Sequence, residues 1–347
     1  MSIDIQNLPK SWSELTWMQL CRMWDVKQRY AGNNDVARVA ALLALLGCHA
    51  RKSRKKPCTT IHPITGETLY RLTNDKGCQW VVTAREAAYM AVQVLPWFDF
   101  PYSDPGEKEE KDKDGNVVKE RREPVTGYVG PMRDAMILPV ETLKIGSRHF
   151  ALPGVACNNL TWQQYRSLQT ISPQLFAEGL TDDQALALQA KFLANILVPR
   201  TIAVLDTSGG SIRLRPHYEY RYNAEQAEGL VRYFERRLKK EITKRQVKGR
   251  QCSMSTLFHI CFQTYQTALN YYSIAYPLLF SSNDKGDTLR DALQGEVGTV
   301  NTIMKYAGYA EQQLVYDSNL PFVLDILNTM TKEAKEIEKM NAKMKKK

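Results

Sequence analysis

The sequence contains none of the short motifs that mark the common enzyme classes. GxSxG, the phosphate-binding GxxxxGKS/T, GxGxxG and HExxH are all absent from its 347 residues. Its five histidines are scattered along the chain. His259 lies among regularly spaced aromatic residues, where an imidazole is more typical of packing than of general base catalysis. We therefore expect a protein that is not an enzyme and carries no cofactor.

Paired cysteines and long apolar runs are also missing. The seven cysteines are an odd number and include no CxxC pair, which is typical of reduced core thiols. No stretch approaches the roughly 20 apolar residues that span a bilayer. Residues Met1 to Lys10 lack the apolar segment of a signal peptide. These features predict a soluble protein in a reducing, cytoplasmic compartment, with no membrane contact.

Two segments match metal sites only in part. Cysteines and histidines occur between 48 and 78 at spacings that fit no standard tetrahedral zinc site: Cys48, His49, Cys58, His62 and Cys78. Residues Glu110 to Asn116 are similar to the start of a calcium loop, but the twelfth position, which needs a glutamate, is Arg121. We expect no bound metal, and zinc at Cys48, Cys58 and His62 is the alternative.

The net charge of +10 comes mainly from two segments. Arg232 to Arg250 carries nine Lys or Arg against two Glu, and Lys332 to Lys347 carries seven Lys against three Glu. Basic helices attract polyanions by releasing counterions, but they also occur as solvated faces that keep a protein soluble. We favour the solvated face. A nucleic-acid site would use the basic helix at 232–250, through Arg236, Arg237, Lys240, Lys244 and Arg245.

An internal repeat organises the first two thirds of the chain. Leu8-Pro9 is followed by LTWMQL, and Leu152-Pro153 is followed by LTWQQY. An Ala- and Leu-rich helix is predicted after each copy, at 35–46 and at 183–197. Each copy then leads through a β-like stretch into another helix.

Capping residues mark where these helices begin. In a capping box a Thr hydroxyl accepts from the third backbone N–H of the helix, and a Gln or Glu side chain reaches back to the cap. Trp17 and Trp162 follow directly after two of these caps and are expected to anchor the small core of each repeat. The four predicted helix starts are Thr16 to Gln19, Thr83 to Glu86, Thr161 to Gln164 and Asn223 to Gln226.

These patterns predict a mainly α protein: two duplicated helical units with small β segments, followed by a helical C-terminal region. The first unit should span 1–102, and the second, which begins with a small β segment, 129–250. Between them, 103–128 is so rich in charge that we expect a loop or a disordered insertion, with a hairpin turn at Asp114-Gly115 as an alternative. Strands are expected at 136–140 and 149–152.

The C-terminal region, 251–347, is predicted to be helical and to end in a basic tail. Phe258, Phe262, Tyr265, Leu269, Tyr272 and Tyr276 recur at steps of three and four residues, the stripe of a packed helix that ends before Pro277. The three expected helices are 253–280, 288–309 and 319–344.

The repeated block resembles a family of phage proteins. LTWQQY at Leu160 to Tyr165 and FLANILVPR at Phe192 to Arg200 are similar to the pattern of tail assembly chaperones from tailed bacteriophages and prophages of gut Bacteroidetes. The residues from Tyr316 to Lys347 are similar to short helical proteins of the same gene neighbourhood.

This resemblance implies a protein that coats the long tape-measure protein before the tail tube polymerises, in the cytoplasm of the bacterial host. Such a chaperone would bind an extended or helical apolar partner in shallow grooves between amphipathic helices. We place the expected contacts around Trp17, Leu20, Trp162 and Tyr165. The alternatives are a structural subunit that stays in the virion and a nucleic-acid-binding accessory protein.

Overall fold

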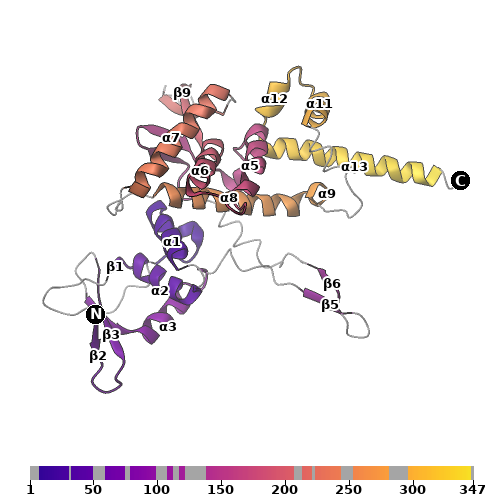
Figure 1. The fold of residues 1–347 in the computed structure, drawn as a ribbon. Helices are drawn as coiled ribbons and strands as arrows, with labels where there is room; N and C mark the ends of the chain where they lie inside the picture. Colours follow the sequence, from indigo (N-terminus) through magenta and orange to yellow (C-terminus); the bar gives the residue numbers. More distant parts are fainter. Residues whose placement is uncertain are drawn as a thin grey trace. The chain divides into compact units, whose positions relative to one another are not determined.

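The computed structural model describes residues 8–30, 33–49, 59–74, 79–98, 108–111, 117–121, 138–206, 213–220, 223–243, 253–280 and 296–344. The described chain is mainly helical with small antiparallel sheets, which confirms the predicted fold class (Figure 1). It forms two compact units, Met1–Pro139 with Lys248–Leu257 and Val140–Val247 with Phe258–Lys347. Most of the predicted C-terminal region therefore belongs to the same compact unit as the second repeat.

The first unit packs its helices in chain order, α1 against α2 and α2 against α3. Its small sheet has β3 in the middle, paired with β4 along one edge and with β1 and β2 along the other. Leu72 and Val82 of this sheet are buried with Ala87 of α3. The elements are η1 Trp12–Glu14, α1 Trp17–Arg29, α2 Asn34–Leu45, β1 Cys48–His49, β2 Thr59–Ile61, β3 Thr68–Asn74, β4 Gln79–Thr83 and α3 Ala84–Val94.

The second unit contains a similar order of elements: a 3-10 turn, two helices, a β-hairpin and a third helix. Its described residues include no strands between α6 and α7 that correspond to β1 and β2. Here too the helices pack in chain order, α5 against α6 and α6 against α7. The hairpin strands β9 and β10 pair as β3 and β4 do in the first unit. The elements are η3 Val155–Cys157, α5 Trp162–Gln174, α6 Asp182–Ile196, β9 Val198–Asp206, β10 Arg213–Tyr218 and α7 Ala224–Thr243.

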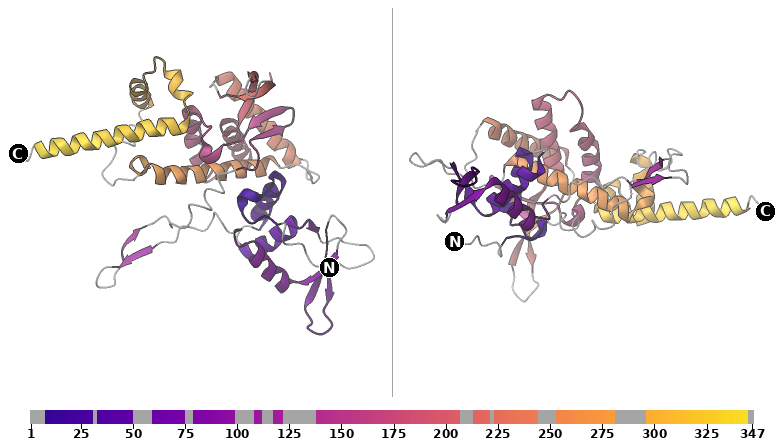
Figure 2. Two further views of the ribbon diagram at one scale, coloured as in Figure 1. Left: turned by 180° about the vertical axis from the view of Figure 1, so that it is seen from behind. Right: turned by 90° about the horizontal axis from the view of Figure 1, so that it is seen from below.

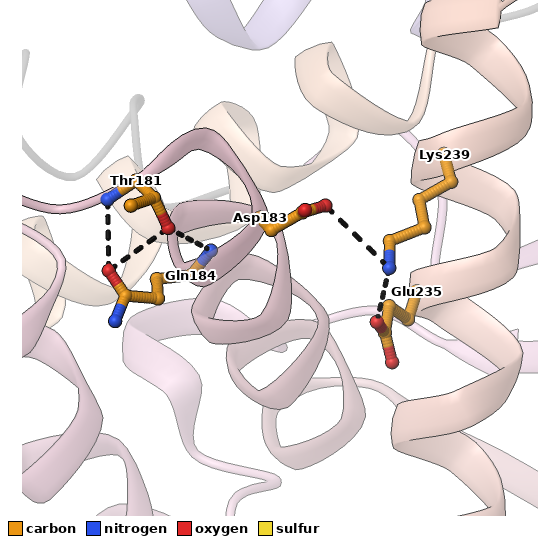
Figure 3. A network of polar contacts seen from close by, with 5 residues as sticks. All are labelled: Thr181, Asp183, Gln184, Glu235 and Lys239. Atoms are coloured by element: carbon orange, nitrogen blue, oxygen red, sulfur yellow. Dashed lines mark hydrogen bonds and ion pairs between the residues drawn. The ribbon is translucent and has the colours of Figure 1, made fainter.

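Local capping explains why these helices begin where they do. Thr16, Thr83 and Thr161 each form both hydrogen bonds of a capping box, as predicted. Asn223 caps α7, because its Oδ1 accepts the backbone N–H groups of Glu225 and Gln226 at 2.9 and 3.1 Å. Thr181, which was not predicted, forms a fourth capping box with Gln184 (Figure 3).

A second hairpin extends the sheet of the second unit. Strands β7 Thr142–Ile145 and β8 Arg148–Ala151 continue it in the order β10-β9-β8-β7. Phe150 of β8 is fully buried and its ring centroid lies 5.3 Å from that of Phe234 in α7. The strand predicted at 149–152 is confirmed. The one predicted at 136–140 is wrong for the described residues 138–140, because pairing begins at Thr142.

The aromatic stripe of the long helix α8 Met254–Ala275 packs on α6, as a buried helix face should. Phe192 of α6 lies 5.4 Å from both Phe258 and Phe262 and 5.9 Å from Tyr265, measured between ring centroids. A proline, which is favoured at the first position of a helix, then begins α9 Pro277–Phe280. The remaining helices are α11 Glu296–Ala307, α12 Gln312–Tyr316 and α13 Leu320–Met344.

The predicted insertion at 103–128 contains regular structure. Strands β5 Lys108–Lys111 and β6 Val117–Arg121 pair in an antiparallel ladder (Figure 1). A loop or disordered segment is therefore the wrong prediction for these nine residues. The proposed turn residues Asp114 and Gly115 lie outside the described residues.

Candidate partner-binding surfaces

Three of the four residues expected to contact a partner are buried. Leu20 is 6%, Trp162 2% and Tyr165 3% exposed, whereas Trp17 is half-buried. A side chain without accessible surface cannot contact a second protein in this conformation. The predicted surface is therefore corrected: Leu20, Trp162 and Tyr165 are buried, and for Trp162 the expected core role is confirmed.

Trp162 and Tyr165 instead help to join α5 to the C-terminal helices. Their ring centroids lie 5.4 Å apart. The backbone N–H of Trp162 donates to the Ser318 carbonyl at 2.8 Å, and the N–H of Leu320 donates to the Leu160 carbonyl at 2.8 Å. The buried Gln164 also ties α5 to α6, by donating to the Asn195 carbonyl at 2.6 Å. This end of α5 is consequently covered by its own unit.

A group of buried hydroxyl and thiol side chains lies near the same end of α5. Burial raises the pKa of Cys157 to about 12 and that of Tyr165 to about 12. Burial also raises the pKa of Tyr265, whose hydroxyl has no hydrogen-bond partner among the residues that the structure describes. A protonated, fully buried thiol is not a nucleophile, so these residues do not form an activated catalytic group.

Ala156 and Cys157 are both in the left-handed region, with φ of 52° and 55°. Residues other than glycine adopt this region at an energetic cost. The Tyr272 hydroxyl donates to the Ala156 carbonyl at 2.8 Å, and the Asn159 amide accepts from the Gly154 N–H at 2.7 Å. These contacts hold the turn that precedes α5.

In the first unit, Lys27 of α1 lies in an aromatic cluster. Its Nζ lies 5.3 Å from the ring centroid of Trp12 and 4.8 Å from that of Phe98. Trp12 and Trp97 hold the cluster together, since Trp12 Nε1 donates to the Trp97 carbonyl and Trp97 Nε1 donates to the Pro9 carbonyl, at 3.1 and 3.2 Å. Burial, and then the charge of Arg38, lower the pKa of Lys27 to about 7. Through these contacts the cluster joins the start of the first repeat to the residues that follow α3.

The partly matched metal ligands are not assembled in the described part of the chain. There, no group of three or more His, Cys, Asp or Glu side chains could hold a metal ion. The side chain of His62 stabilises the turn that follows it, because its Nδ1 accepts hydrogen bonds from the N–H groups of Ile64 and Thr65 at 3.3 and 3.1 Å. Cys58 and Cys78 lie outside the described residues.

His259 is half-buried in α8, with its ring centroid 5.1 Å from that of Phe258. Burial lowers the pKa of His259 and so favours its neutral form. These surroundings are those of a packed imidazole at the edge of a core.

The clearest apolar surface in the second unit lies on the last turns of α13. Ile337, Met340 and Met344 are 53%, 56% and 68% exposed. Steps of three and four residues place them on one helix face. The first half of α13 packs into the unit, with Val323 fully buried, whereas the second half extends beyond the neighbouring helices (Figures 1 and 2).

We call Ile337, Met340 and Met344 the α13 stripe. The spacing of these three residues could have been found in the sequence. Their exposure could not, because the same pattern on the first half of the helix is buried.

The basic helix α7 is partly neutralised by its own neighbours. Arg232 forms an ion pair with Glu228 at 2.7 Å. Lys239 lies between Glu235 at 2.9 Å and Asp183 at 3.7 Å (Figure 3), and the hydrogen bond and charge of Glu235 raise the pKa of Lys239. Of the predicted nucleic-acid residues, Arg236 and Lys240 are exposed and Arg237 is half-buried, whereas Lys244 and Arg245 lie outside the described residues.

No family model, no curated protein and no solved structure matches this chain. Among the residues that the structure describes, no helix combines the length and apolar character needed to cross a membrane.

Proposed function

We propose that this protein is a non-enzymatic assembly or structural protein of a tailed phage that binds a helical segment of an elongated partner such as a tape-measure protein. The partner class comes from the resemblance of LTWQQY and FLANILVPR to tail assembly chaperones. The α13 stripe is the observation that carries the proposal, because an exposed apolar helix face is the surface that helix-in-groove recognition uses. The site of action would be the host cytoplasm.

Charge favours an acidic partner helix at this surface. The last nine residues of the chain contain five lysines and no acidic residue. Opposite charges flanking an apolar seam speed encounter and suppress wrong partners. A second copy of this chain would bring the same lysines together and so pairs less well than an acidic helix does.

The test is a tagged pull-down from producing cells at moderate salt and with added nuclease, analysed by mass spectrometry. The tested variant carries Ile337→Ser, Met340→Ser and Met344→Ser. The matched control is Ile64→Ser, which removes a side chain that is 88% exposed on the first unit. We expect the wild type and the control to recover one long, acidic, helical phage protein and the triple variant to lose it.

Three results would contradict the proposal. Equal recovery by the triple variant and the control would show that the α13 stripe is not the contact. A loss of molecular mass in light scattering with the triple variant alone would assign the stripe to self-association. Recovery of mixed nucleic acid in place of a phage protein, in a parallel pull-down without nuclease, would favour the accessory role instead. Mass spectrometry of purified particles distinguishes a chaperone from a retained virion subunit.

A further inference from the structure

The β7–β8 hairpin and α7 meet at Tyr233. The Tyr233 hydroxyl donates a hydrogen bond to the Ile145 carbonyl at the end of β7. Its ring centroid lies 6.1 Å from that of Phe150 and 5.4 Å from that of Phe234. Phe150 and Phe234 are fully buried core residues, so their contacts help to fix the position of the Tyr233 ring.

Two arginines from different elements lie against this one ring. The Cζ atom of Arg148, from β8, is 4.9 Å from the Tyr233 centroid, and that of Arg237, from α7, is 5.2 Å away. Cation–π contact of this kind holds a guanidinium in place without neutralising its charge. Two like charges are thereby kept at the same aromatic side chain.

The turn between the strands is shaped for this arrangement. Gly146 has a φ of +59°, and a Cβ at this position would lie 1.7 Å from Arg237 Nη2. The guanidinium of Arg237 therefore lies directly against the backbone of the turn. A residue with a side chain here would displace it.

Neither arginine has an acidic partner among the described residues. Within the described part of the chain, Arg148 and Arg237 form no ion pair, whereas Arg232 and Lys239 on the same helix do. Arg148 is exposed and Arg237 half-buried. Planar guanidinium groups bind carboxylates and phosphates through paired hydrogen bonds. An oxyanion would supply the acidic partner that each guanidinium lacks among the described residues.

We propose that Arg148 and Arg237 bind phosphate groups of a nucleic-acid backbone. The surrounding charge selects a polymer over a single phosphate. Two further cations close to the arginines in sequence, Lys144 and Arg236, are also exposed. A line of cations gains affinity for each phosphate it neutralises, because each contact releases condensed counterions. Contacts to the backbone position the polymer and do not read its sequence.

The test measures fluorescence anisotropy of labelled single-stranded and duplex DNA oligonucleotides with the full-length protein across a salt series. The tested variant is Arg148→Gln with Arg237→Gln. The matched control is Arg232→Gln, which removes one charge from α7 at a residue already paired with Glu228. We expect the double variant to bind roughly tenfold or more weakly and its salt slope to fall by about two. The control should change affinity by less than about threefold.

Further variants and competitors keep the result interpretable. Arg148→Lys with Arg237→Lys keeps the charge and loses the paired hydrogen bonds, so intermediate affinity is expected. Inorganic phosphate should compete only weakly with the oligonucleotide. Far-UV circular dichroism and the unfolding midpoint of each variant show whether the fold survives.

Several outcomes would overturn the proposal. One is that neither oligonucleotide binds at low salt. Another is that the double variant and the Arg232→Gln control lose affinity equally. Tight binding of inorganic phosphate alone would assign the site to a small phosphate ligand. Binding to vesicles containing anionic lipid, without binding to oligonucleotides, would assign it to a membrane surface.

Discussion

The backbone N–H of Trp162 donates a 2.8 Å hydrogen bond to the carbonyl oxygen of Ser318. Trp162 is the first residue of α5, and the first N–H groups of a helix have no acceptor within the helix. Ser318 supplies one from the segment just before α13. Thr161 and Asn319 form an isolated β-bridge at the same place. The second repeat is thus tied to the C-terminal helices through the start of its first helix.

Truncation of Trp162 should destabilise the fold rather than remove a contact to a partner. Trp162→Ala removes a side chain that is 2% exposed, and we expect it to lower the free energy of unfolding by about 3–5 kcal/mol. Trp17→Ala, at a half-buried side chain, should cost less. Chemical denaturation followed by circular dichroism measures both. A Trp162→Ala protein with wild-type stability that fails to capture its partner would restore Trp162 to the binding surface.

The buried cap at Thr161 should matter more than the exposed cap at Thr16. Both are capping boxes, but Thr161 is 5% exposed and its partner Gln164 is fully buried, so water cannot replace the lost acceptor. Thr161→Ala should cost about 1–2 kcal/mol of unfolding free energy and Thr16→Ala about 1 or less. Thr161→Ser keeps the hydroxyl and serves as the control. Equal costs for the two alanine variants would contradict this account.

Gly146→Ala tests the contact between the hairpin turn and α7. Alanine at a φ of +59° is strained, and its Cβ would displace Arg237. Gly179→Ala, at a φ of +79° with nothing within 4 Å, introduces the backbone strain alone. Both should lower stability, by about 1–2 kcal/mol from the strain. Only Gly146→Ala should also weaken oligonucleotide binding. If Gly179→Ala weakens it equally, the Arg237 contact is not the cause.

Lys27 should make stability depend on pH. Its pKa is about 7 in the folded protein, against about 10.4 in an unfolded chain. Between these values the unfolded state binds more protons, so stability should rise with pH from about 7 to about 10. Below pH 7 the residue is protonated in both states and contributes no slope.

The measurement for Lys27 compares wild type with Lys27→Met by denaturant unfolding at pH 6, 8 and 9.5. The wild type should gain stability relative to the variant as pH rises. The faces of Trp12 and Phe98 favour the charged ammonium and oppose the effect of burial. A difference that stays constant across the series would mean that these rings offset the burial completely.

Predictions for the candidate site were weaker than those for the fold. The sequence placed Trp162 and Tyr165 on a helix, which the structure confirms, but it also placed them on a partner-binding surface, whereas both are buried. It could not show that the segment before α13 covers the start of that helix. The sequence also could not show that Arg148 and Arg237 contact the same Tyr233 ring, because one lies in a hairpin and the other in a helix far along the chain.

The sequence by itself determined the aromatic stripe of α8 and four helix starts, at Thr16, Thr83, Thr161 and Asn223. These depend on hydrogen bonds and side-chain spacing within a few residues, as at Thr16, Thr83 and Thr161. Only the tertiary structure decided which faces stay exposed. Burial depends on partners that are distant in sequence. Trp162 is buried where its backbone meets Ser318, whereas Ile337 and Met340 are exposed to water. Both halves of α13 have apolar residues, but Val323 and Leu324 of the first half are buried, whereas Ile337 and Met340 of the second half are exposed.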